Sequence, residues 1–170
     1  MRYLIILLLV LSACEVKVST GTGTDKAEVA ARNTAKIRNA IDVSTTGYIK
    51  VEQAFLTYAD NGSFVSDSNV TTINRPVKLN LIVSGWKGTD GKVSIDAAQK
   101  ITTNEGGVVL DEKDMFKDSN PVSEKDAGYL SFQCVITSIN KLFDYFLVEV
   151  IARNKDADQQ VKASFKMHVE

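Results

Sequence analysis

Few side chains in this chain of 170 residues could act as nucleophiles or bases. It has two cysteines, Cys14 and Cys134, and a single histidine, His168. A catalytic serine or cysteine needs a base beside it, and histidine is the usual one. His168 falls on the polar side of the alternating stretch that ends the chain, so we expect a solvated surface histidine. The sequence therefore predicts no catalytic triad, no histidine-rich metal site, and no cofactor.

Carboxylates offer two further kinds of chemistry, acid–base catalysis and calcium binding. Asp111, Glu112 and Asp114 cluster in one connection, and Asp156 and Asp158 in a turn. A glycosidase needs only two carboxylates, and Ca²⁺ takes oxygen ligands from loops. Solvated carboxylates also ordinarily lie in turns, and neither cluster has the EF-hand order of ligands. We expect solvated groups here, with calcium binding as an alternative and an enzyme as the third interpretation of function.

The single tryptophan, Trp86, is the candidate for ligand contact. It lies between Gly85 and Gly88 at the end of a predicted strand, and its parity is opposite to that of the inward residues of the strand. An exposed indole could stack on a sugar or pack on a partner protein. It could equally cover the rim of the core, and both interpretations stay open here.

The other cysteine, Cys134, alternates with Leu130, Phe132 and Ile136, which is typical of a half-buried strand. We expect a small buried apolar side chain. If Cys14 is modified, Cys134 is the only thiol left, and no intrachain disulfide can form.

The first fourteen residues have the order of a secretory signal. Arg2 supplies positive charge, Leu4 to Leu11 is an unbroken apolar run, and the small residues Ser12 and Ala13 precede Cys14. The run is too short to span a bilayer, since a membrane helix needs about 20 residues. A cleaved signal is therefore favoured over a membrane helix.

Leu11-Ser12-Ala13-Cys14 resembles the lipobox of bacterial lipoproteins. The resemblance covers residues 1–14. It implies a signal peptide over 1–13, removed before Cys14, whose thiol carries a diacylglycerol and whose new amine is acylated. Two or more acyl chains anchor a protein firmly, at about 0.8 kcal/mol per buried CH₂. We expect an extracytoplasmic, lipid-anchored protein, at the outer membrane and its periplasmic face rather than at the inner membrane or the cell surface.

Composition limits the partners. Removal of residues 1–13 takes away only Arg2, which leaves 19 basic and 21 acidic residues and a net charge of −2. A nucleic-acid-binding protein would show a basic excess or a basic stripe. No nucleic-acid partner is therefore predicted, and the remaining length suits one domain.

Two short segments precede the predicted domain. Residues 14–24 are rich in glycine and threonine and are interpreted as the lipidated cysteine and a flexible tether. Residues 25–42 are predicted to be helical, with Asp25 and Glu28 as a capping box and a narrow apolar face that includes Ile37 and Ile41.

Residues 46–170 change to a period of two, with turn signals between short runs. The clearest run is the last, where Val161, Ala163, Phe165, Met167 and Val169 share one face. We expect a mainly β domain: an antiparallel, immunoglobulin-like β-sandwich of about 7–9 strands, with a closed barrel as the second choice. Other aromatic residues within the strand alternations are expected in its core: Phe55, Phe132, Tyr145, Phe146 and Phe165.

Part of this domain also resembles a β-sandwich found in uncharacterised lipoproteins of Gram-negative bacteria. The residues concerned are Gly107-Val108-Val109-Leu110 and Asp114-Met115-Phe116, followed by two long strands, and the likeness covers roughly residues 75–170. It implies the fold and carries over no functional residue. The expected function is a non-catalytic binding or accessory module of the bacterial envelope, with a protein partner. Carbohydrate or small-ligand binding at the loops near Trp86 is the alternative.

The lipobox generates the first prediction. Substitution of Cys14 by alanine removes the only thiol that could carry the lipid, so Cys14→Ala is expected to release the protein from membranes. Fractionation of cells that produce the parent and the variant measures this. Membrane association that persists in Cys14→Ala would contradict the anchor.

Overall fold

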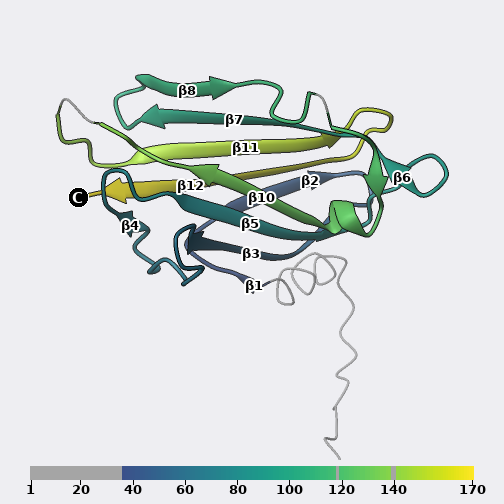
Figure 1. Ribbon diagram of the computed structural model, residues 1–170, viewed down its shortest axis with the longest axis horizontal. Coiled ribbons are helices and arrows are strands. Elements are labelled where there is room, and N and C mark those ends of the chain that lie inside the picture. Colours follow the sequence, from purple (N-terminus) through teal and green to yellow (C-terminus); the bar gives the residue numbers. More distant parts are fainter. Residues whose placement is uncertain (1–35, 118, 139–140) are drawn as a thin grey trace, which may run out of the picture.

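The computed structural model describes residues 36–117, 119–138 and 141–170, and the chain there forms two main β-sheets (Figure 1). The four-stranded sheet has the order β1-β3-β5-β10, and the six-stranded sheet has the order β2-β12-β11-β7-β8 with β4 beside β12. All neighbours are antiparallel except β1 with β3 and β4 with β12. Strands of the four-stranded sheet are β1 (Lys36–Ile37), β3 (Lys50–Tyr58), β5 (Val77–Ser84) and β10 (Tyr129–Cys134). Those of the six-stranded sheet are β2 (Asp42–Thr46), β4 (Val70–Thr71), β7 (Ile95–Thr103), β8 (Val108–Glu112), β11 (Phe146–Asn154) and β12 (Gln160–Val169).

Three short elements complete the described chain. β6 (Lys92–Val93) pairs with β9 (Val122–Ser123), and a 3₁₀ turn, η1 (Asp126–Gly128), leads into β10. The connection from β8 to β10 therefore contains β9 and η1.

The inner faces of the two sheets build one hydrophobic core. In β12, Val161 and Phe165 are buried while Lys162 and Lys166 are exposed, and the other three apolar residues predicted for that face are also buried. β5 buries Val77, Leu79, Leu81 and Val83 in the same manner. The prediction of a mainly β, sandwich-like domain is thus confirmed. The described strands form separate sheets rather than a closed barrel.

The prediction of a helix is wrong for the part of it that the structure describes, residues 36–42. Residues 36–42 form β1, a turn, and the start of β2, so strand structure begins before residue 46. Asn39 and Ala40 both have positive φ angles, of 60° and 46°, which no helix accommodates. The Asn39 side chain accepts a hydrogen bond from the Leu56 N–H, so a tertiary contact overrides the local helical preference. The rest of that prediction, with the signal peptide, Cys14 and the tether, lies outside the described residues.

A bulge in β3 explains why Phe55, expected in the core, is not buried there. A bulge between Val51 and Gln53 shifts the register, so Ala54 and Leu56 are buried in place of Phe55. Phe55 is only partly buried and packs edge-on against Phe64. Tyr145, just before β11, is likewise only partly buried, whereas the other three predicted core aromatics are 1–2% exposed: Phe132, Phe146 and Phe165.

No helix in the described ranges has the length and apolar character needed to cross a membrane.

Cys134 is a core residue, as predicted. It is 4% exposed, and its sulfur lies 3.8 Å from the Met167 sulfur of the opposite sheet. Burial raises the pKa of the thiol to about 12 from an ordinary value of 9.0, because the thiolate would lose its hydration. The thiol is therefore neither a nucleophile nor a metal ligand at neutral pH.

The burial of Cys134 predicts a difference in thiol titration between the folded and unfolded chain. The parent and Cys134→Ala should show the same number of thiols reactive toward a disulfide reagent near pH 8 while folded. After denaturation the parent should show one more, because only unfolding exposes this sulfur. A folded parent that reacts more than Cys134→Ala would contradict the buried position.

Candidate functional site

Trp86, the sequence candidate for ligand contact, is not an exposed ring. Its side chain is 2% exposed and belongs to the hydrophobic core. The flanking glycines serve close packing: a Cβ at Gly85 would overlap the Tyr48 carbonyl, and one at Gly88 would overlap the Lys92 carbonyl. The expectation of a ring free to stack on a sugar is therefore wrong, and the rim-covering interpretation holds. The carbohydrate alternative loses the residue on which it rested.

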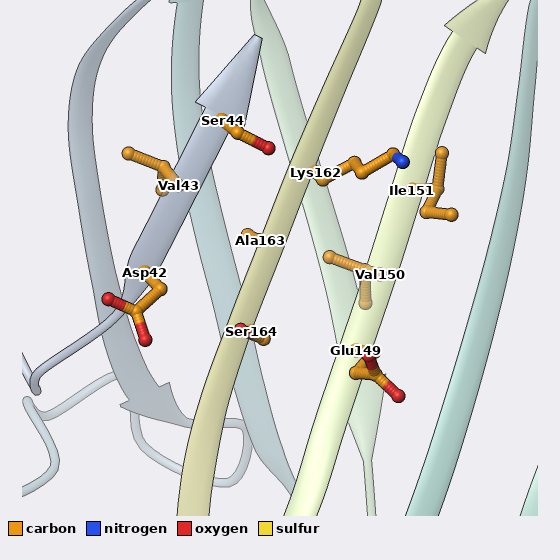
Figure 2. A pocket seen from close by; sticks show the side chains of 9 residues that line it. All are labelled: Asp42, Val43, Ser44, Glu149, Val150, Ile151, Lys162, Ala163 and Ser164. Atoms are coloured by element: carbon orange, nitrogen blue, oxygen red, sulfur yellow. The ribbon is translucent and has the colours of Figure 1, made fainter.

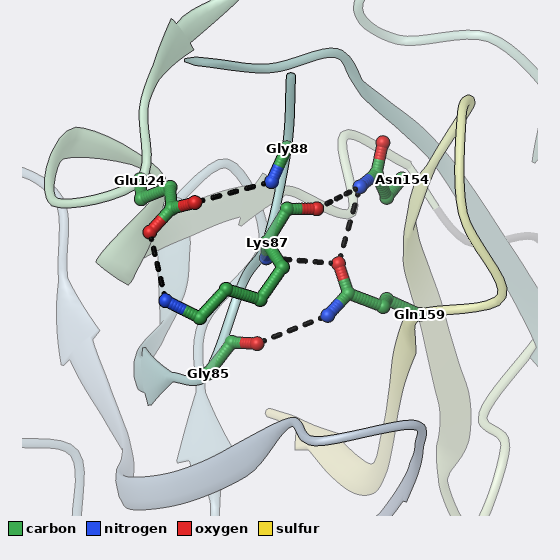
Figure 3. A network of polar contacts seen from close by, with 6 residues as sticks. All are labelled: Gly85, Lys87, Gly88, Glu124, Asn154 and Gln159. Carbon is green, nitrogen blue, oxygen red and sulfur yellow. Dashed lines mark hydrogen bonds and ion pairs between the residues drawn. The ribbon is translucent and has the colours of Figure 1, made fainter. Parts of the chain in front are cut away.

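A network of side-chain amides holds the loop that carries Trp86 (Figure 3). Gln159 accepts hydrogen bonds from the Lys87 N–H (3.0 Å) and the Asn154 amide (3.1 Å), and donates to the Gly85 carbonyl (3.0 Å). The Asn154 amide also donates to the Lys87 carbonyl at 2.9 Å. Asn154 and Gln159, at 4% and 5% exposure, thus connect the β11–β12 hairpin to residues 85–88 and close the core over the indole.

Glu124 binds the same loop from the other side. Its carboxylate accepts hydrogen bonds from the Gly88 N–H and from the Lys87 ammonium, each at 3.2 Å. These two contacts, the Gly88 bond first, lower the pKa of Glu124 below its ordinary value of 4.5. Glu124 and the amides of Asn154 and Gln159 thus hold residues 85–88 from two sides, while the Trp86 indole N–H is buried without a hydrogen-bond partner among the described residues.

The other sequence candidates do not assemble into a catalytic or metal centre. His168 lies on the polar face of β12 as predicted, but it is half-buried, with Nδ1 2.7 Å from the Asp144 carbonyl. The predicted carboxylates Asp111, Glu112, Asp114, Asp156 and Asp158 are exposed. Within the described ranges, no group of three or more acidic, histidine or cysteine side chains could hold a metal ion.

A groove crosses the outer face of the six-stranded sheet, over β2, β12 and β11 (Figure 2). Its volume is about 310 Å³. Ser164 of β12 stands in register with Asp42 of β2 and with Glu149 of β11. Lys162, two residues earlier, stands in register with Ser44 and Ile151 in the same way. The short Ser164 side chain lies between the longer Asp42 and Glu149 on the two neighbouring strands.

The charged side chains of this groove form no ion pairs with one another. No ion pair among the described residues involves Asp42, Glu149 or Lys162, although all three are exposed. Neighbouring strands are about 4.8 Å apart, so the main chains of Asp42 and Glu149 lie roughly 10 Å apart across β12. The groove thus presents side chains of both charge signs to solvent.

The groove continues into a second hollow of about 630 Å³ that shares Asp42 and Ser164 with it. This part exists because β2 pairs with β12 only as far as Ser164, and β4 joins β12 only at His168. Leu147 and Lys166 line the interval between them.

Two buried asparagines replace a strand along that interval. The Asn69 amide donates to the Lys166 carbonyl (2.9 Å) and to the Asn39 carbonyl (2.8 Å), while the Asn69 carbonyl accepts from the His168 N–H. Asn39 in turn donates to the carbonyls of Val65 and Ser66. Sequence reasoning missed both residues. The only signal for them is that asparagine tolerates positive φ, which Asn39 and Asn69 share with Asn74.

Loss of the Asn69 side-chain contacts should lower the stability of the fold by more than the positive φ of this residue alone would explain. Asn69→Ala leaves two buried carbonyls unpaired, at roughly 1–3 kcal/mol each, in addition to about 1 kcal/mol for alanine at positive φ. Urea unfolding of the full-length chain measures the change.

Asn74→Ala is the matched control, because Asn74 has a φ of 64°, is exposed, and makes no side-chain hydrogen bond among the described residues. It should cost only the conformational part. Equal losses in the two variants would show that the Asn69 amide contributes nothing.

Comparison with known proteins identifies no family for this chain. No protein-family model matches the chain, and no curated protein matches its sequence. Among solved structures, the crystal structure of the C-terminal domain of Wzt is similar, with 14% sequence identity, a TM-score of 0.46, and coverage of 83% of this chain and 84% of that one. A likeness at this level assigns neither a family nor a function, which must be argued from the residues of this chain.

Proposed function

We propose that this protein is a lipid-anchored, non-catalytic binding module of the bacterial envelope, and that a protein partner docks on the outer face of its six-stranded sheet. The observation that carries the proposal is the groove over β2, β12 and β11, where Asp42, Glu149 and Lys162 are exposed without an ion-pair partner among the described residues. Charges of both signs across one face favour a partner with the complementary pattern.

The form of the groove favours a macromolecule over a small molecule. Small-molecule sites are concave and lined mostly by apolar and aromatic side chains. This groove lies on the open face of a sheet, and the charged side chains of Asp42, Glu149 and Lys162 project from the three strands beneath it (Figure 2). A protein surface can follow such a face and supply a partner for each charge.

The absence of a catalytic step rests on the state of the reactive groups. The Cys134 thiol is buried with a raised pKa, and the His168 ring is engaged with the Asp144 carbonyl. No histidine or cysteine lines the part of the groove over β2, β12 and β11. Recognition is therefore the activity that this face supports best.

The anchor and its location complete the proposal. The lipobox Leu11-Ser12-Ala13-Cys14 supports lipidation at Cys14, and we place the domain at the outer membrane, on its periplasmic side. We assign the sandwich to the immunoglobulin-like class, because the chain crosses repeatedly between the two sheets, as from β2 to β3 and from β5 to β7.

A pull-down with a charge reversal tests the docking face. Tagged full-length protein in mild detergent should retain a stoichiometric partner, and Lys162→Glu should reduce its recovery by about tenfold or more, since like charges across an interface cost several kcal/mol. Lys50→Glu, an equally exposed lysine on β3 of the other sheet, is the matched control and should retain the partner.

Two results would overturn the proposal. Equal recovery with Lys162→Glu and the parent would move the partner away from this face. Failure of any protein to co-purify with the parent at stoichiometric level would reject a protein partner.

A further inference from the structure

The second hollow, which adjoins the docking groove, combines apolar and polar side chains. Residues 40–42 and 67–69, Leu147 of β11 and four residues in the second half of β12 surround its volume of about 630 Å³. Ile41 and Leu147 supply apolar surface, and most of the remaining side chains are polar or charged. A hollow of this composition suits a ligand that has an apolar stem and a polar end.

Asn69 brings an unused hydrogen-bond acceptor to this hollow. The residue lines the hollow and is 5% exposed. Its Nδ2 donates to the carbonyls of Asn39 and Lys166, whereas its Oδ1 has no hydrogen-bond partner among the described residues. The large majority of buried side-chain acceptors in proteins have a donor. A donor from outside the chain would therefore complete the hydrogen bonding of Asn69.

His168 supplies a second acceptor. The residue is half-buried and lines the hollow, and its Nδ1 lies 2.7 Å from the Asp144 carbonyl. A carbonyl oxygen can only accept, so Nδ1 carries the proton of this hydrogen bond. The other ring nitrogen, Nε2, is then an acceptor in the neutral ring.

Two carboxylates give the hollow an excess of negative charge. Asp42 is exposed and takes part in no ion pair among the described residues. Asp67 lies 3.9 Å from the Arg38 guanidinium, but an exposed pair of this kind contributes little, so Asp67 can still accept from a ligand. Lys166 is the one lining residue with a permanent positive charge, and its Nζ lies over the Tyr145 ring, 4.3 Å from the ring centre. The free polar atoms of the hollow are therefore mainly acceptors.

We propose that the second hollow binds a guanidinium group, and that an arginine side chain of the protein partner supplies it. A guanidinium is planar and always charged, and it has five N–H donors and no acceptor. Such a group suits a hollow whose acceptors come from three separate segments: β2, the loop before β4, and β12. The methylene stem of the arginine can pack on the apolar surface beside them.

The choice of an arginine rests on the proposed docking of a protein partner on this face, whose groove shares Asp42 and Ser164 with the hollow. A metal ion fits the same place less well, because no group of three or more acidic, histidine or cysteine side chains in the described ranges could hold one. The preference of the hollow for a guanidinium is a property of this chain alone. It can therefore be tested without the partner.

Nuclear magnetic resonance of the isotope-labelled full-length chain in mild detergent tests the site, with N-acetylarginine amide as the probe. Binding of the probe should saturate with a dissociation constant of about 1–10 mM, a range within reach of a single side chain. The largest shifts should fall on the main-chain amide of Asp42 and on the side-chain amide of Asn69. N-acetylcitrulline amide, which has nearly the same shape and no charge, should bind about fivefold more weakly or less.

Asp42→Asn keeps the shape of the side chain and removes its charge, so it should weaken binding of the arginine probe by about fivefold. Asp158→Asn is the matched control, because Asp158 is also exposed but lies in the turn before β12, and this variant should bind as the parent does. Three results would overturn the proposal: no saturation by the arginine probe, equal affinity for the citrulline probe, or equal affinity in Asp42→Asn and the parent.

The guanidinium site and the proposed function fail separately. Recovery of a partner that depends on Lys162, with no saturation by the arginine probe, would reject the guanidinium site alone. Saturation by the probe, with no protein partner in the pull-down, would reject the proposed function and with it the arginine of a partner, while the guanidinium site itself would stand.

Discussion

The main-chain groups along the outer edge of β12 need hydrogen-bond partners. No single strand is long enough to pair with the whole of that edge. Buried main-chain groups cannot remain unpaired without a large cost. β2 pairs with the first half of β12 and β4 with its last two residues, so Asn69 bonds to the Lys166 carbonyl in the interval. The second hollow, beside the groove, follows from this change of partner. Because β2 begins only at Asp42, the surface outside Ser164 and Leu147 stays open.

The same solution recurs at the opposite end of the sandwich. There the Asn154 and Gln159 amides bond to the main chain of residues 85–88 and so enclose Trp86. An amide side chain carries both a donor and an acceptor, like a peptide group, and can therefore stand in for a missing strand neighbour. The buried asparagines and glutamine are thus part of the sheet architecture. The large core indole is tolerated because the glycines beside it allow close main-chain contact.

The sequence predicted the strands that bury one face and expose the other in strict alternation. β5 and β12 alternate without interruption, so their inward residues could be named from the period alone. Prediction failed where a distant contact decides the conformation. The bulge in β3 moved Phe55 out of the core, and Asn39 turned a helical pattern into a strand and turn. Asn69 could not be found because its partner Lys166 is far along the chain, and an isolated loop asparagine ordinarily indicates only a turn.

The two sheets are unequal in width, and this leaves the edges of the larger one exposed. Six strands face four, so the two edges of the larger sheet, β2 and β8, have little of the opposite sheet to cover them. An edge strand that the opposite sheet does not cover need not bury apolar side chains. The two edge strands differ in composition. β2 is mostly polar and borders the charged groove, which suits water or a polar partner surface. β8 exposes three consecutive apolar residues, and water alone is a poor neighbour for such a strand.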